Sequence, residues 1–121
     1  MEGNFTGKWG EIYAARHLRD KGYSIESVNY RVRGGEIDII AGRGDCLAFV
    51  EVKTRGRNPF DIPSAAVDFN KQRKLTYAAA GYLQKYPTER QPRFDVIEIT
   101  LDEKYNVLEL RHIENAFESQ L

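Results

Sequence analysis

The sequence predicts an α/β domain in which helices cover a mixed β-sheet. Three observations predict this class: two segments with helical spacing of apolar residues, five runs rich in Val, Ile and Phe, and the order of these segments along the chain. The predicted order is helix, three strands, helix, two strands, which is typical of an α/β sandwich. At 121 residues the chain has the length of one domain, 1–121.

The first helix is predicted over 6–21, with Thr6 as its N-cap and Gly22 just past its last turn. Glu11 lies four positions before Ala15 and seven before Leu18, so it shares their face of the helix. Its carboxylate could reach a metal or phosphate site from there. The alternative is an acidic residue in the first turn, where the helix dipole favours a negative charge. The apolar or small residues of this helix are Trp9, Ile12, Tyr13, Ala15 and Leu18.

A first strand is predicted over 23–30, and the arginines that follow it, Arg31 and Arg33, are expected to face solvent. A glycine turn then leads into a hairpin over 35–55. Its two strands, GEIDII and LAFVEVKTR, are joined by the turn AGRGDC, whose glycines tolerate positive φ.

The second helix begins at Ser64 or Asp68 and ends at Tyr86, because Pro87 cannot continue it. Two more strands are predicted, over 93–101 and 107–113. Asp95 heads the apolar face of the first of these, and we expect it to form a salt bridge or turn contact instead of a catalytic one. The stripe expected to be buried on the helix is Leu75, Ala78, Ala79, Tyr82 and Tyr86.

Charged side chains interrupt the hairpin at positions that otherwise look buried. Side chains alternate along a strand, so Glu51 and Lys53 share a face with Phe49, while Val50 and Val52 lie on the opposite face. Both faces of this second strand begin with apolar residues, and only the face of Glu51 and Lys53 carries charged residues further along. Burying carboxylates and an ammonium group costs several kcal/mol unless they are paired or bind a metal. The interrupted pattern therefore indicates a functional site.

The chemistry that this pattern favours is a magnesium site. Asp38 and Glu51 lie on adjacent strands with converging carboxylates, and Mg²⁺, or Mn²⁺, prefers hard oxygen ligands of this kind. The backbone carbonyl of Val52 could be a further ligand. Lys53 could hold the attacking water or the scissile phosphate, because phosphoryl transfer depends mainly on positioning and electrostatics. The alternative is a simple ion pair between Glu51 and Lys53.

Other classes of site lack the necessary residues. Cys46 is the single cysteine, which excludes an internal disulfide, and His17 and His112 stand far apart in sequence, which argues against structural zinc. Both histidines are expected at the surface or in packing roles. The sequence shows neither a signal peptide nor an apolar run long enough to span a membrane, so we expect a cytoplasmic protein that does not bind membranes.

The basic residues gather in the middle of the chain. Segment 1–52 has 7 basic and 8 acidic residues, 53–93 has 9 and 3, and 94–121 has 2 and 7. A positive surface could therefore lie beside the carboxylates and bind a phosphate backbone, although charges that are grouped in sequence often mix in space. The candidates for nucleic-acid binding, each of which could instead be solvated surface, are Arg55, Arg57, Lys71, Arg73 and Lys74.

These motifs resemble known proteins. Asp38, thirteen positions before Glu51-Val52-Lys53, resembles the PD-(D/E)xK signature of restriction-endonuclease-like nucleases, with Ile37 in place of the usual proline. Glu11 is similar to an extra acidic residue of archaeal-type Holliday junction resolvases. The whole chain resembles the YraN family of small, functionally uncharacterised bacterial proteins. That resemblance is carried by the helix over 7–18, NYR at 29–31, GEIDII, FVEVKTR, Lys71, RFDVIEI and the terminal HIENAF.

The resemblance implies a restriction-endonuclease-like fold, with Asp38 and Glu51 as metal ligands, Lys53 as a catalytic residue and Glu11 as an aid to binding metal or water. Glu36 is either an outer-shell carboxylate or a surface residue at a strand end. The first functional hypothesis is a Mg²⁺-dependent DNA endonuclease that acts on branched or damaged DNA. The others are a noncatalytic nucleic-acid-binding or accessory protein, and an enzyme that acts on RNA or free ends. Resolvase-like proteins pair to cut two strands, so a homodimer is compatible, with Tyr105 or Phe117 as interface aromatics.

Overall fold

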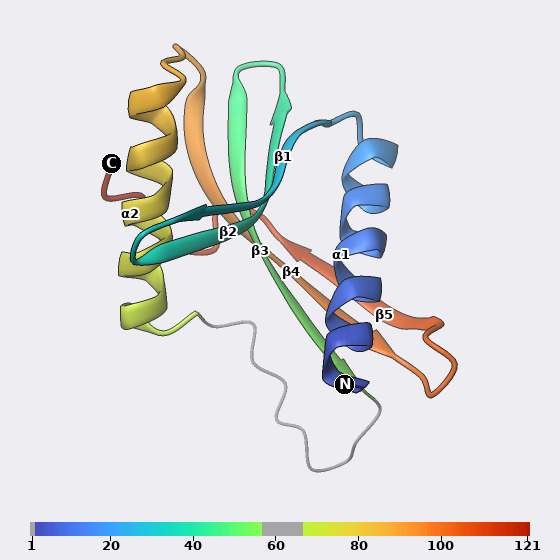
Figure 1. Ribbon diagram of the computed structural model, residues 1–121. Coiled ribbons are helices and arrows are strands. Elements are labelled where there is room, and N and C mark those ends of the chain that lie inside the picture. The colour runs from blue at the N-terminus through green and yellow to red at the C-terminus, as the bar shows by residue number, and fades with distance from the viewer. Residues whose placement is uncertain (1, 57–66) are drawn as a thin grey trace.

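The computed structural model describes residues 2–56 and 67–121. It confirms the predicted order of helix, three strands, helix and two strands, which is consistent with a restriction-endonuclease-like fold. Figure 1 shows the two helices on opposite sides of a strongly twisted sheet. The elements are α1 (Glu2–Asp20), β1 (Ser24–Val32), β2 (Gly35–Arg43), β3 (Cys46–Gly56), α2 (Phe69–Lys85), β4 (Gln91–Leu101) and β5 (Val107–Ile113).

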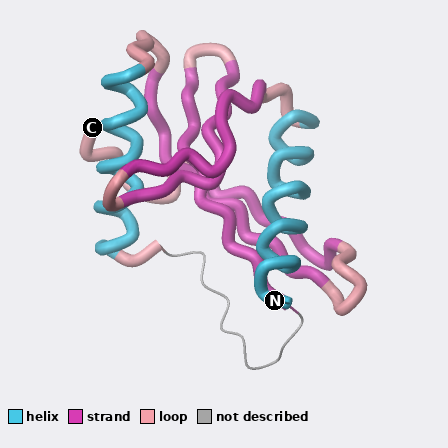
Figure 2. The backbone as a smooth tube through the Cα atoms, viewed as in Figure 1, coloured by secondary structure: helices cyan, strands magenta, loops and turns pink. Residues whose placement is uncertain are grey.

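The five strands form one sheet in the order β1-β2-β3-β4-β5. β3 and β4 are parallel and the other three neighbouring pairs are antiparallel. Parallel strands need a long crossover connection, which α2 supplies between β3 and β4. Figure 2 shows the strands as a continuous layer between the helices. The central strands are therefore covered on both faces, which explains why their sequences are apolar on both faces.

Each face of the sheet has its own hydrophobic core. On the α1 face, Val50 packs with Leu18 and Ile97, and on the α2 face, Phe49 packs with Leu75 and Val96. The predicted alternation along β3 is thus confirmed. Among the described residues, no helix has the length and apolar character needed to cross a membrane.

The first helix begins earlier than predicted. α1 starts at Glu2, so Thr6 lies inside the helix and is not its N-cap. The C-terminal end is as predicted: Gly22 has φ +91°, its N–H donates to the Arg19 carbonyl, and the Tyr23 N–H donates to the Leu18 carbonyl. This pair of bonds is the Schellman motif, which needs a residue that tolerates positive φ.

The face that α1 buries is narrower than predicted. Ala14, Ala15 and Leu18 are buried, whereas Trp9 and Ile12 are exposed. The small residues allow the helix to lie close to the sheet. At Gly10 the approach is so tight that an added Cβ would overlap the Thr54 side chain of β3.

The second helix begins at the later of its two predicted positions. Asp68 is the N-cap, and its Oδ1 accepts the Lys71 N–H at 2.8 Å. The buried stripe is confirmed at four of its positions and wrong at Tyr86, which is 50% exposed. Tyr86 is the C-cap residue, where the chain leaves the helix.

Candidate metal and nucleic-acid site

The candidate site forms where two strands of the sheet separate. The pairing of β2 with β3 runs from Arg43 opposite Cys46 to Ile39 opposite Val50 and then stops. At the next position of β2, Asp38 Oδ2 accepts the N–H of Val52 at 2.8 Å. A side-chain carboxylate thus replaces the backbone carbonyl that would continue the ladder. The separation opens the sheet beside two acidic residues.

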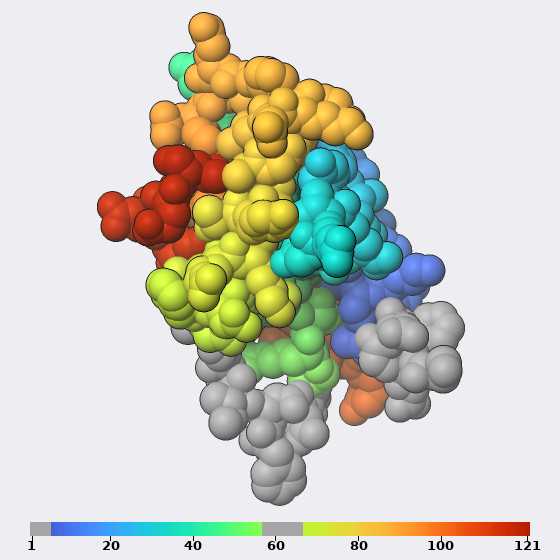
Figure 3. Space-filling view, turned by 60° about the vertical axis from the view of Figure 1, so that its left-hand side comes forward, coloured from blue at the N-terminus to red at the C-terminus, as the bar shows by residue number. Residues whose placement is uncertain are grey.

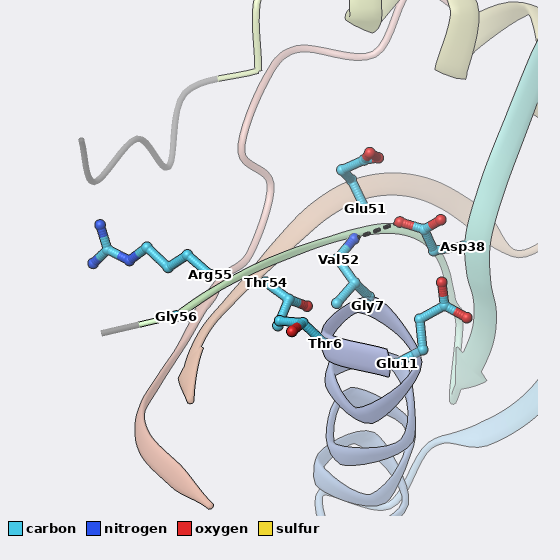
Figure 4. A pocket seen from close by; sticks show the side chains of 9 residues that line it. All are labelled: Thr6, Gly7, Glu11, Asp38, Glu51, Val52, Thr54, Arg55 and Gly56. Carbon is cyan, nitrogen blue, oxygen red and sulfur yellow. Dashed lines mark hydrogen bonds between the residues drawn. The ribbon is translucent and has the colours of Figure 1, made fainter. Parts of the chain in front are cut away.

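An open cleft of about 480 Å³ occupies this opening. Asp38, Glu51 and Glu11 all line it, together with Arg55. Figure 4 shows Asp38 between the other two carboxylates, with Glu11 reaching it from α1 and Glu51 on the far side of β3. Because the strands separate here, side chains from both faces of the sheet reach one cleft. In Figure 3, atoms of β3 are visible between α2 and α1.

The position of Glu11 decides between its two interpretations. It is not in the first turn, because α1 begins nine positions earlier at Glu2. It lies instead where α1 passes the end of the β2–β3 ladder, and its charge is one cause of the raised pKa of Asp38. The structure therefore places Glu11 beside the predicted pair.

The two central carboxylates resist ionisation. Burial raises the pKa of Asp38 to about 7, and repulsion from Glu51 adds to the effect, although the Val52 N–H opposes it. Burial also raises the pKa of Glu51, against the attraction of Lys71 and Lys53. Two neighbouring carboxylates that are costly to charge and that face an open cleft form a site where an added cation would be stabilising.

Glu51 has a cationic partner that the motif does not include. Lys71 of α2 places its Nζ 3.2 Å from Glu51 Oε1, so this lysine points toward the carboxylates, and its role in nucleic-acid binding stays a prediction. Burial alone would lower the pKa of Lys71, but Glu51 outweighs this and raises it. Lys53 lies on the same face of β3, opposite Glu98 of β4, and its charge lowers the pKa of Glu51.

The remaining predicted residues divide between two locations. Arg55 lines the carboxylate cleft, where its Nε donates to Thr100 Oγ1 at 3.1 Å. Arg73 and Lys74 are exposed on α2 and line a different cleft. Glu36 is exposed at the start of β2 and forms an ion pair with Arg31, which favours the surface interpretation. Arg57 lies outside the described residues.

The donor set fits a hard divalent cation that keeps much of its own hydration. Within residues 2–56 and 67–121, no three His, Cys, Asp or Glu side chains are grouped so that they could hold a metal ion. Asp38 and Glu51 would thus supply two carboxylates, and water, backbone or substrate oxygens would complete the coordination. Mg²⁺ is commonly bound in this way. The carbonyl of Val52 stays a predicted ligand, since the contact seen here is through its N–H.

A second polar cluster, which the sequence did not predict as a unit, lies on the α1 face. His112 Nε2 donates to Asp95 Oδ2 at 2.8 Å, and His112 Nδ1 is 3.2 Å from Nε2 of His17. Arg93 donates to both oxygens of Asp95. The salt-bridge prediction for Asp95 is confirmed, but the histidines meet each other across 95 positions of sequence. The signal for this cluster in the sequence was that Arg93 and Asp95 lie two positions apart on one strand and so share a face.

The predicted interface aromatics are packed into the fold. Tyr105 is half-buried, its carbonyl accepts the Tyr13 hydroxyl at 2.8 Å, and its ring stacks near Trp9. Phe117 is also half-buried and stacks on Phe94, with ring centroids 4.8 Å apart. Contacts from α1 and β4 therefore cover part of each ring, and a role for either residue in an interface stays a prediction.

Comparison with known proteins identifies the family of the chain. Residues 10–99 match the model of an uncharacterised protein family, UPF0102. A UPF0102 protein of Caldanaerobacter subterraneus is 45% identical over 114 residues, covering 93% of each chain. One from Alkaliphilus oremlandii is 45% identical and covers 92% of this chain and 96% of its own. One from Dictyoglomus thermophilum is 40% identical and covers 97% and 100%. The chain therefore belongs to the UPF0102 family, whose members include the YraN-like proteins that its motifs resemble.

Proposed function

We propose that this protein is a Mg²⁺-dependent nuclease that hydrolyses phosphodiester bonds of DNA. One observation carries the proposal: the sheet opens at Asp38, where the half-buried Asp38 and the buried Glu51, both with raised pKa values, line an open cleft of about 480 Å³. The chemistry of the donor set favours a hard cation, and the cation would relieve the repulsion between Asp38 and Glu51.

The residues around the cleft have separate roles in this proposal. Asp38 and Glu51 hold the cation, and Glu11 binds a water molecule at the α1 side of the cleft. Lys53 holds the scissile phosphate or the attacking water, and Arg55 binds a neighbouring phosphate. When bound, Mg²⁺ supplies a more acidic water and neutralises charge on the phosphate oxygens.

A second candidate function is favoured by the contact between Lys71 and Glu51. Because Nζ of Lys71 lies 3.2 Å from Glu51 Oε1, the carboxylate already has a cationic partner within the chain. In a noncatalytic nucleic-acid-binding protein this pair would be permanent, and divalent metal would find no site. The two candidates therefore differ in their response to metal alone.

The test is thermal unfolding with and without Mg²⁺ or Mn²⁺. A metal at ten times its dissociation constant stabilises the native state by about 1.4 kcal/mol, which raises the Tm of a domain of this size by several degrees. We expect this rise in the wild type and in Asp45→Asn, which changes an exposed aspartate at the far end of the same hairpin. Asp38→Asn should abolish the rise.

Cleavage assays then separate the nuclease from a metal-binding protein without activity. Labelled branched, flapped, single-stranded and duplex DNA are incubated with Mg²⁺ or Mn²⁺, and RNA is included as the competing substrate. Asp38→Asn, Glu51→Gln and Lys53→Met should each abolish cleavage without loss of the folded state. A wild type that neither responds to metal nor cuts any of these substrates would favour the noncatalytic candidate.

A further inference from the structure

The outward face of α2 carries a second open cleft, of about 900 Å³. We call it the aromatic groove. Its walls are the turn between β1 and β2 on one side and the C-terminal segment on the other, and Figure 3 shows α2 between these two segments. The side chains that matter here are Arg33, Phe69, Arg73, Lys74, Tyr77 and Phe117.

Two aromatic side chains that line this groove are mostly exposed to solvent. Phe69 is 73% exposed and Tyr77 is 62% exposed. Their positions follow the i, i+4, i+8 spacing with Arg73 between them, so the three side chains form one row along the helix, roughly 12 Å from first ring to last. The edge of the Tyr77 ring rests near the turn at Gly34, which leaves its outer face open. The row presents two flat apolar surfaces with a cation between them.

The charge of the groove identifies the kind of partner. Arg33, Arg73 and Lys74 line it, and among the described residues that line it none is acidic. A second copy of this chain is a poor occupant, because a symmetric contact would place the same cations against one another. A polyanion with exposed aromatic faces complements both properties at once, and base stacking on aromatic side chains combined with phosphate binding by cations is how single-stranded nucleic acid is held.

The aromatic groove is connected to the carboxylate cleft by shared residues. A smaller hollow of about 270 Å³ lies between α2 and the start of β2, lined by Gly34, Lys71 and Lys74 and also by Glu36, whose carboxylate is paired with Arg31. Gly34 and Lys74 also line the groove, and Lys71 contacts Glu51 in the cleft. A strand that follows Lys74 and then Lys71 would therefore pass from the groove toward Glu51.

We propose that the aromatic groove binds the unpaired bases of a single-stranded DNA segment whose backbone continues into the carboxylate cleft. Stacking requires bases whose faces are open, which excludes a regular duplex at this position. The choice of DNA over RNA rests on the proposed nuclease function. The substrate class is therefore DNA with a single-stranded region next to the bond that is cut, such as a flap, a gap or an open junction.

The test measures binding of a short fluorescent oligothymidylate by anisotropy, in the presence of a chelator so that no cleavage is needed. Phe69→Ala and Tyr77→Ala should each weaken binding about fivefold or more. Tyr77→Trp should retain it, because the larger ring still stacks. The matched control is Tyr86→Ala, which removes an exposed aromatic of the same helix outside the groove. All four variants should unfold at close to the wild-type temperature.

The outcomes separate this inference from the proposed function. Wild-type binding that is lost in both alanine variants supports the groove even if no DNA is ever cut, in which case only the nuclease fails. Wild-type protein that cuts DNA while both alanine variants bind and cut like the wild type overturns the groove alone. The inference is also overturned if the wild type does not bind the single strand, or if it binds duplex or RNA of matched length more tightly. A wild-type dimer that Tyr77→Ala dissociates would overturn it as well.

Discussion

The pKa values of two aspartates of this protein shift in opposite directions. Burial alone would raise the pKa of Asp95, but hydrogen bonds from His112, Arg93 and the Asn115 N–H lower it to about 2. Asp38 receives one backbone N–H, faces Glu51, and has its pKa raised to about 7. Asp95 is buried, and Asp38 is half-buried at the edge of an open cleft. The difference shows that burial does not by itself make an acid functional; what matters is whether the chain supplies its counter-charge.

The largest expected effect is a difference in stability between substitutions at the two aspartates. Asp95→Asn removes the charge that Arg93 and His112 surround, and breaking a buried pair in this way costs about 3–5 kcal/mol. Asp38→Asn should be neutral or stabilising at pH 8 without metal, because it removes a carboxylate that is costly to charge. Urea unfolding of both variants checks this. Equal destabilisation would mean that Asp38 is structural as well.

A second experiment uses the helix that contributes to both clusters. Gly10→Ala drives a Cβ into Thr54, and overpacking of this kind costs about 1–3 kcal/mol. Gly7→Ala, one turn earlier, meets nothing within 4 Å and should stabilise the helix by roughly 0.5–1 kcal/mol. Denaturant midpoints measure both. If Gly10→Ala is as benign as Gly7→Ala, α1 does not lie as closely on β3 as described, and Glu11 need not reach the cleft.

The pH dependence of stability should distinguish Asp38 from Asp95. Its folded pKa lies above the unfolded value of 3.8, so the stability that it contributes is complete below pH 3.8 and is lost as pH rises toward 7. Wild type should therefore gain about 1–3 kcal/mol relative to Asp38→Asn between pH 8 and pH 5 without metal. Asp95 adds nothing in this window, because its own loss occurs only as pH falls through about 2.

The same comparison in saturating Mg²⁺ is the control for that measurement. A bound cation replaces the proton, so wild type should no longer gain on Asp38→Asn as the pH falls. Burial and the charges of His112 and Lys21 lower the pKa of His17, and acid therefore costs stability through His17 in both proteins. Its contribution cancels in the difference. If the stability difference between wild type and Asp38→Asn does not change with pH, both with and without Mg²⁺, the raised pKa of Asp38 is contradicted.

The smallest effect concerns the cations themselves. Arg93 is held on the same strand as Asp95, whereas the side chain of Lys71 is 49% exposed and can leave Glu51. Lys71→Met should lower the stability of the metal-free protein by about 1 kcal/mol or less and enlarge the stabilisation by Mg²⁺, because a competing cation is gone. Lys74→Met is the matched control and should change neither. A smaller response to Mg²⁺ in Lys71→Met would show that the lysine assists metal binding.

The sequence predicts features that depend on short-range spacing. Asp38 and Glu51 belong to one hairpin, so alternation along two strands was enough to bring them together, and Gly22 and Asp68 end and begin helices through contacts within one turn. Features that depend on packing between elements were not predictable in this way. Trp9 and Tyr86 fit an apolar stripe, but both are exposed in the fold. The meeting of His17 with His112 depends on the register of β5.

The separation of β2 from β3 at Asp38 also has a consequence for the order of folding. The hydrogen bond from Val52 to Asp38 closes a loop of 14 positions, whereas the contact between His17 and His112 closes one of 95. Short loops cost less entropy to close, so the hairpin with its acidic pair should form before the two ends of the chain dock. Amide exchange tests this: Val52 should be protected at least as strongly as Asn115, whose N–H binds Asp95. Partial opening at the termini would then leave the carboxylate pair assembled.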